Sequence, residues 1–188
     1  MNLPNKLTIL RAVLVPVFLL FLLVPNIPYN YLFAFVVFAV ASLTDYFDGR
    51  IARKRNMVTS FGKFMDPLAD KVLVTSALIA FCAMGFAHPV AVIIIVARDF
   101  MVSAIRLAAV SSDGQVIAAN IWGKIKTALQ MVVICGVLVA LHFASIYQAV
   151  SPDVILYSNI AMWVLTAVTA ISGGIYLKQN ASLINTFK

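Results

Sequence analysis

Long apolar runs separated by short turn-forming segments constrain this chain more than any other feature. Of its 188 residues, 63% are hydrophobic and only 11% are charged, and the mean hydropathy is +1.00. Soluble domains are about 45–50% apolar and about 25% charged. Runs such as residues 90–96 are continuously apolar and lack the alternation of a transmembrane strand. The sequence therefore predicts an all-α integral membrane protein.

Turn signals divide the sequence into six apolar spans. A helix needs about 20 predominantly apolar residues to cross the hydrocarbon core, so six spans are near the limit for 188 residues. Proline, glycine, serine and clusters of basic residues mark the breaks. We expect a six-transmembrane-helix bundle that forms a single domain over residues 1–188. Its predicted spans are residues 7–24, 30–54, 61–86, 89–111, 120–143 and 154–177.

The basic residues indicate how this bundle is oriented. Lys and Arg occur near both termini and around the second and fourth breaks, whereas the breaks at 25–29, 85–89 and 144–153 contain none. Cytoplasmic loops of membrane proteins carry an excess of Lys and Arg. Both termini are therefore predicted to be cytoplasmic, and the net charge of +7 would attract anionic lipid headgroups on that face.

Four of the seven acidic residues lie between Asp45 and Asp70. Asp45 and Asp48 are three residues apart, and Asp66 and Asp70 are four apart, so each pair shares one helix face. If the two helices are antiparallel neighbours, the four carboxylates converge and repel one another unless cations bind. Oxygen ligands without His or Cys select Mg²⁺ or Mn²⁺ over zinc.

The alternative is that these aspartates form interfacial ion pairs with nearby basic residues. Small residues beside them argue against it, because helix interiors disfavour glycine, whereas small side chains would let a flat base or a diphosphate approach the backbone. The basic candidates for the ion pairs are Arg50, Arg53, Lys54 and Lys63, and the small residues are Gly49, Ala52 and Gly62.

The spacing Asp-x2-Asp-Gly-x2-Ala-Arg-x8-Gly-x3-Asp-x3-Asp resembles the motif of the CDP-alcohol phosphatidyltransferase family. The resemblance implies a six-helix membrane bundle that moves a phosphatidyl group from CDP-diacylglycerol to an alcohol and releases CMP. Eight motif positions are met, at Asp45, Asp48, Gly49, Ala52, Arg53, Gly62, Asp66 and Asp70.

The same resemblance implies a role for each of these residues. Asp45, Asp48 and Asp66 would hold a pair of divalent metal ions, Mg²⁺ or Mn²⁺. Asp70 would be the catalytic base that takes the proton of the attacking hydroxyl, and would also contact metal. The nucleotide and its diphosphate would be bound at Gly49, Ala52, Arg53 and Gly62.

A second group of charged residues bears on the acceptor alcohol. Arg98 and Arg106 are eight residues apart, about two helical turns, and two lysines and a hydroxyl begin the next span. Such a group suits an anion, because Arg makes bidentate phosphate contacts. The alternatives are interfacial anchoring for Arg106 and the lysines, and pairing with Asp99 or Asp70 for Arg98. The residues of the next span are Lys124, Lys126 and Thr127.

These segments resemble the phosphatidylglycerophosphate synthase branch of the family, although many of its members have Glu in place of Asp99. The branch implies sn-glycerol 3-phosphate as acceptor and a bacterial enzyme of the cell membrane, and the family suggests a homodimer. The distribution of Lys and Arg places the active site at the cytoplasmic face. The matching segments are Pro4-Asn5-x2-Thr8-x2-Arg11, Arg98-Asp99-x6-Arg106 and Gly123-Lys124-x-Lys126-Thr127. Asn5 and Thr8 would frame the nucleotide, and the acceptor phosphate would be bound by Arg98, Arg106, Lys124, Lys126 and Thr127.

Two other hypotheses stay open at this point. The same chemistry could serve another acceptor, namely phosphatidylglycerol, inositol phosphate or serine. A divalent-cation transporter could instead use the aspartates as its ion path. Transporters often carry related features in both halves, and the acidic cluster has no counterpart in residues 94–188. We expect no nucleic-acid partner.

Overall fold

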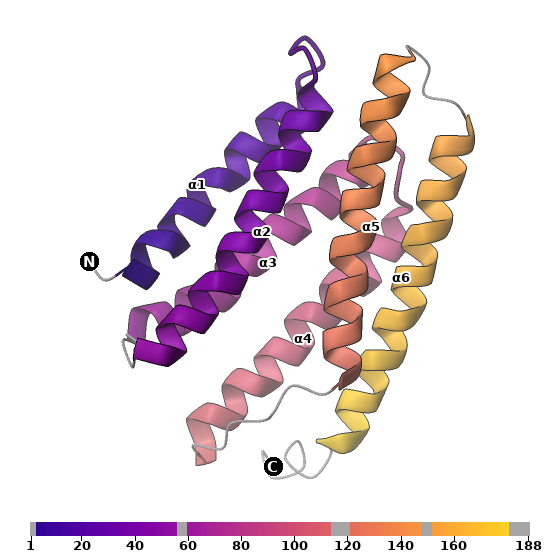
Figure 1. The fold of residues 1–188 in the computed structure, drawn as a ribbon. Helices are drawn as coiled ribbons and strands as arrows, with labels where there is room; N and C mark the ends of the chain where they lie inside the picture. The colour runs from indigo at the N-terminus through magenta and orange to yellow at the C-terminus, as the bar shows by residue number, and fades with distance from the viewer. Residues whose placement is uncertain (1–2, 56–59, 114–120, 148–151, 181–188) are drawn as a thin grey trace.

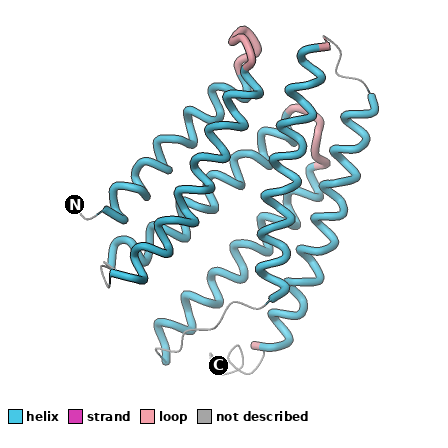
Figure 2. The backbone as a smooth tube through the Cα atoms, in the orientation of Figure 1, coloured by secondary structure: helices cyan, strands magenta, loops and turns pink. Residues whose placement is uncertain are grey.

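The computed structural model describes residues 3–55, 60–113, 121–147 and 152–180. Side chains are described for residues 10–44, 71–106, 121–147 and 152–180. The described backbone is helical apart from turns (Figure 2), which confirms the all-α prediction. Its six helices begin and end within a few residues of the predicted spans. They are α1 (Leu3–Leu23), α2 (Asn30–Arg55), α3 (Ser60–Ala83), α4 (Pro89–Asp113), α5 (Ile121–Ile146) and α6 (Pro152–Gln179).

The helices form two groups of three. In the first group α1 packs against α2 and α3, and in the second α6 packs against α4 and α5. Contacts of α2 with α5 and of α3 with α4 join the groups. Successive helices alternate in direction (Figure 1), so the end of α2 and the start of α3 lie toward the same end of the bundle as the start of α5 and the end of α6. We call this the lower end, as it is drawn in Figure 1.

Aromatic and branched aliphatic side chains fill the space between the helices. The rings of Phe18 in α1 and Phe38 in α2 are 5.6 Å apart between centroids, and both side chains are fully buried. On the outside, many large apolar side chains are exposed, far more than the scattered ones of a soluble surface. Examples from different helices are Leu20, Val36, Ile79, Ile93, Val132 and Val164.

Two of the described helices, α5 and α6, are long and apolar enough to cross a membrane. Shorter apolar stretches within α1, α2 and α3 cover Leu10–Leu23, Asn30–Thr44 and Lys71–Ala83. The apolar exterior and these helix lengths agree with the predicted class of protein.

The turn between α3 and α4 depends on a glycine. Gly85 has a φ of +83°, a left-handed conformation that costs other residues energy. The Gly85 N–H donates to the Cys82 carbonyl (3.1 Å), and the Phe86 N–H donates to the Phe81 carbonyl (2.8 Å). This is the Schellman pattern, in which an apolar contact accompanies the two hydrogen bonds; Phe81 and Phe86 are both buried.

We predict that Gly85→Ala lowers the free energy of unfolding by about 1 kcal/mol, because alanine resists a positive φ. The matched control is Gly136→Ala in α5, where an added Cβ meets nothing within 4 Å. There the substitution should be neutral or stabilising. Thermal unfolding of the purified protein in detergent measures both variants. Equal stability of Gly85→Ala and the wild type would contradict this account of the turn.

Candidate functional site

The aspartate motif lies where two neighbouring helices meet. Asp45 and Asp48 are in the last turns of α2, and Asp66 and Asp70 are in the first turns of α3. These two helices contact each other, and their adjoining ends lie at the lower end of the bundle (Figure 1). The antiparallel neighbourhood expected from the sequence is therefore present at the level of the backbone.

The structure does not describe the side chains of the motif residues, so the roles of these residues stay predictions. The same holds for the two candidates in α1. The residues concerned are Asn5, Thr8, Asp45, Asp48, Gly49, Ala52, Arg53, Gly62, Asp66 and Asp70. Among the described side chains, no three His, Cys, Asp or Glu residues gather as metal ligands would.

A buried ion pair joins α4 to α5. The Lys126 ammonium donates to both carboxylate oxygens of Asp99, with Nζ–Oδ1 and Nζ–Oδ2 distances of 2.6 and 2.5 Å. It also donates to the Gln130 side-chain carbonyl, one turn further along α5. Lys126 is 2% exposed, so the alternative that it anchors the protein at the membrane interface is wrong.

The Asp99 carboxylate has a second cationic partner in its neighbour, Arg98. Arg98 Nη1 lies 3.3 Å from Asp99 Oδ1, and Nη2 donates to the Ser172 hydroxyl of α6 at 2.7 Å. The pairing of Arg98 with Asp99, one of the alternatives for Arg98, is therefore present. One carboxylate thus holds a cation from α4 and a cation from α5, and Arg98 extends the contact to α6.

The ion pair also reaches α3. Ser103 donates its hydroxyl to the Asp99 main-chain carbonyl at 2.9 Å, and the Lys71 ammonium contacts the Ser103 hydroxyl. Lys71 directly follows Asp70 in the sequence, so this chain of contacts ends beside the aspartate motif. We call the connected residues the polar cluster; they are Lys71, Arg98, Asp99, Ser103, Lys126, Gln130 and Ser172.

The other predicted acceptor residues are on the surface. Arg106, Lys124 and Thr127 are exposed, and the Thr127 hydroxyl donates to the Gly123 carbonyl of its own helix at 2.9 Å. The structure therefore brings Arg98 and Lys126 together through Asp99. It leaves the remaining three at the surface of α4 and α5.

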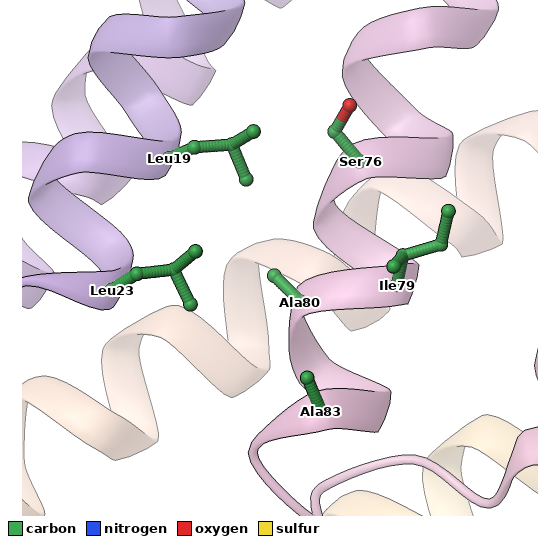
Figure 3. A pocket seen from close by; sticks show the side chains of 6 residues that line it. All are labelled: Leu19, Leu23, Ser76, Ile79, Ala80 and Ala83. Atoms are coloured by element: carbon green, nitrogen blue, oxygen red, sulfur yellow. The ribbon is translucent and has the colours of Figure 1, made fainter.

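Two hollows open between described helices. One, of about 230 Å³, lies between α1 and α3 and is lined by Leu19, Leu23, Ser76, Ile79, Ala80 and Ala83 (Figure 3). Its lining carries one hydroxyl and no charge, so it offers nothing to bind a phosphate. The second, of about 280 Å³, lies between α4 and α6 and has Arg98 in its wall.

Sequence reasoning missed several members of the polar cluster. Ser103, Gln130 and Ser172 are uncharged polar residues in largely apolar helices, and each contacts a charged residue or its main chain. Polar residues within membrane helices tend to hydrogen-bond across helices. That tendency is the signal that could have drawn attention to them, although it does not name their partners.

Comparison with known proteins decides the family. A family model described as CDP-alcohol phosphatidyltransferase matches residues 1–171. The chain belongs to the CDP-alcohol phosphatidyltransferase family. It is therefore a membrane enzyme of phospholipid synthesis, as the aspartate motif indicated.

Relatives within the phosphatidyltransferase family are similar over most of the chain. The CDP-diacylglycerol–glycerol-3-phosphate 3-phosphatidyltransferase of Bacillus subtilis is 39% identical, with 98% of each chain covered. The protein of the same name from Rickettsia bellii is 36% identical, with 94% of each chain covered. A probable phosphatidylglycerophosphate synthase of Mycobacterium tuberculosis is 43% identical over 71% of this chain and 64% of its own.

The buried ion pair yields a stability prediction. Lys126→Met should lower the free energy of unfolding by about 2 kcal/mol, because it removes one of the two cationic partners of a partly buried carboxylate. The double variant Asp99→Asn/Lys126→Met should recover part of that loss, since the carboxylate that loses Lys126 is then neutral, while Arg98 keeps its contact with Ser172. Unfolding in detergent measures both, with Lys178→Met on the exposed side of α6 as a control for the lost charge. A Lys126→Met protein as stable as the wild type would contradict the pairing.

Proposed function

We propose that this enzyme transfers the phosphatidyl group of CDP-diacylglycerol to sn-glycerol 3-phosphate, giving phosphatidylglycerophosphate and CMP. The observation that carries the proposal is the similarity to the Bacillus subtilis enzyme over 98% of both chains. The complete aspartate motif at the adjoining ends of α2 and α3 supports it. The substrates follow from the names of these relatives and from the resemblance of the acceptor segments.

Asp45, Asp48, Asp66 and Asp70 would hold two divalent ions, Mg²⁺ or Mn²⁺. The fit rests on the donor set, which is four carboxylates on two contacting helices at one end of the bundle, and on oxygen being the preferred ligand of both metals. When bound, the ions would neutralise the diphosphate charge and stabilise the oxygen that leaves with CMP. Arg53, the basic residue of the motif, would bind the diphosphate.

The chain's own residues would supply the remaining steps. Asp70 would take the proton of the acceptor hydroxyl while that oxygen bonds to the lipid-side phosphorus. The bond from this phosphorus to the bridging oxygen breaks, and CMP leaves with the electron pair. A positioned general base contributes about 10²–10⁴-fold to such a step. Gly49, Ala52 and Gly62 would leave room for the nucleotide, which Asn5 and Thr8 would frame.

The acceptor phosphate would be bound by cations of α4 and α5. Arg98 and Lys126 both contact the Asp99 carboxylate, and the Asp99 main-chain carbonyl accepts from Ser103. Ser103 in turn contacts Lys71, the residue that follows Asp70. Exposed Arg106 and Lys124 would meet the phosphate as it arrives from water, and Thr127 would add a hydroxyl. A cationic surface beside a negatively charged substrate also speeds its arrival.

The membrane arrangement is part of this proposal. All six helices would span a bacterial cell membrane as a single domain over residues 1–188, with both termini and the active site at the cytoplasmic face. The support is the distribution of Lys and Arg among the breaks. In that orientation a soluble acceptor reaches the site from the cytoplasm, and the lipid nucleotide reaches it from the bilayer. The family resemblance further suggests a homodimer.

A CMP-release assay tests the proposed function. The purified protein with CDP-diacylglycerol and Mg²⁺ or Mn²⁺ should release CMP when glycerol 3-phosphate is added, and a chelator should abolish release. Phosphatidylglycerol, inositol phosphate and serine serve as competing acceptors. Turnover only with one of these would overturn the acceptor assignment. Mg²⁺ flux into proteoliposomes without CMP release would favour the transporter hypothesis instead.

A further inference from the structure

The side chain of Arg98, which extends from α4, packs directly against Gly173 of α6. A Cβ atom added to Gly173 would lie 2.9 Å from Arg98 Cγ and 3.6 Å from Arg98 Nε. Real Cβ atoms almost never approach another heavy atom to less than 3.0 Å. Because the closest atom belongs to the stem of the arginine and not to its far end, any larger residue at 173 must shift that stem.

The residue before this glycine holds the other end of the arginine. The Ser172 hydroxyl accepts from Arg98 Nη2 at 2.7 Å, and Ser172 is 1% exposed. Asp99 accepts from Nη1 on the other side. α6 therefore limits where the stem can run, and α4 and α6 together fix the plane of the guanidinium. An arginine has five N–H donors, so these two contacts leave others for a ligand.

We propose that Ser172 and Gly173 are positioning residues that aim the Arg98 guanidinium at the acceptor phosphate. This inference rests on the proposed function, in which Arg98 binds that phosphate. Bidentate binding of a phosphate requires a guanidinium whose plane is fixed.

Two adjacent glycines allow a matched test. Gly173→Ala and Gly174→Ala both add one methyl group to α6 and bring the same gain in helix propensity. Only Gly173→Ala meets Arg98, since a Cβ at Gly174 meets nothing within 4 Å. Gly173→Ala should raise the KM for glycerol 3-phosphate by about tenfold, the equivalent of one weakened charge-assisted hydrogen bond. The kcat and the KM for CDP-diacylglycerol should change little, and Gly174→Ala should behave as the wild type.

The second part of the test repeats the glycine substitutions in a protein that carries Arg98→Ala. In that background Gly173→Ala should cause no further rise in KM, because the side chain that it displaces is gone. The melting temperature in detergent should show the same pattern: Gly173→Ala should melt below Gly174→Ala when Arg98 is present, and at the same temperature when it is absent. Ser172→Ala should raise the acceptor KM in the same direction with less effect on stability, and so tests the proposal if Gly173→Ala does not fold.

The outcomes separate the two proposals. If the wild type releases no CMP with glycerol 3-phosphate, the proposed function fails, while the melting temperatures still report whether Gly173 positions Arg98. If the wild type is active, the positioning proposal is overturned by equal KM values for Gly173→Ala and Gly174→Ala. It is also overturned if the effect of Gly173→Ala persists without Arg98, or if Ser172→Ala leaves the acceptor KM unchanged.

Discussion

Charge compensation inside an apolar helix bundle is the constraint on which this structure depends. A carboxylate among lipid-facing helices is costly unless cations and hydrogen-bond donors surround it. Asp99 meets that requirement with Lys126 on one side and Arg98 on the other. Because these partners come from α4 and α5, and Arg98 also contacts α6, polar contacts around Asp99 and Arg98 connect all three helices of the second group.

The same constraint connects packing with the proposed chemistry. The four motif aspartates lie in a chain with few acidic residues, at the end of α2 and the start of α3. Bound divalent ions would compensate their charge as Lys126 compensates Asp99. Lys71 directly follows Asp70 in the sequence and contacts Ser103 of α4. This contact places the aspartate motif next to the polar cluster in the fold. An acceptor held by the cations of α4 and α5 would then lie close to the base that activates it.

Much of the fold could be predicted from the sequence, because apolar length and turn residues determine membrane helices directly. The predicted span 30–54 and the observed helix Asn30–Arg55 nearly coincide, and Pro89 begins α4 as expected. The aspartate motif could be recognised from its spacing within two helices, and the roles of its residues stay predictions. The contacts of Lys126 and Arg98 could not be predicted, because they depend on how α4, α5 and α6 rotate against one another. Ser172 and Gly173 escaped notice for the same reason: a serine and a glycine in an apolar helix do not indicate which arginine they meet.

A Mn²⁺ titration followed by electron paramagnetic resonance, on the wild type and on two aspartate variants, tests whether the motif aspartates hold divalent ions. Two Mn²⁺ ions should bind per chain in the wild type, close enough to couple, as in two-metal sites about 3.5–4 Å apart. Asp45→Asn should weaken binding and abolish CMP release, whereas Asp70→Asn should abolish turnover while CDP-diacylglycerol still binds. Unchanged Mn²⁺ binding in Asp45→Asn, or a wild-type protein that is active but binds no Mn²⁺, would contradict the claim that these aspartates gather around divalent ions.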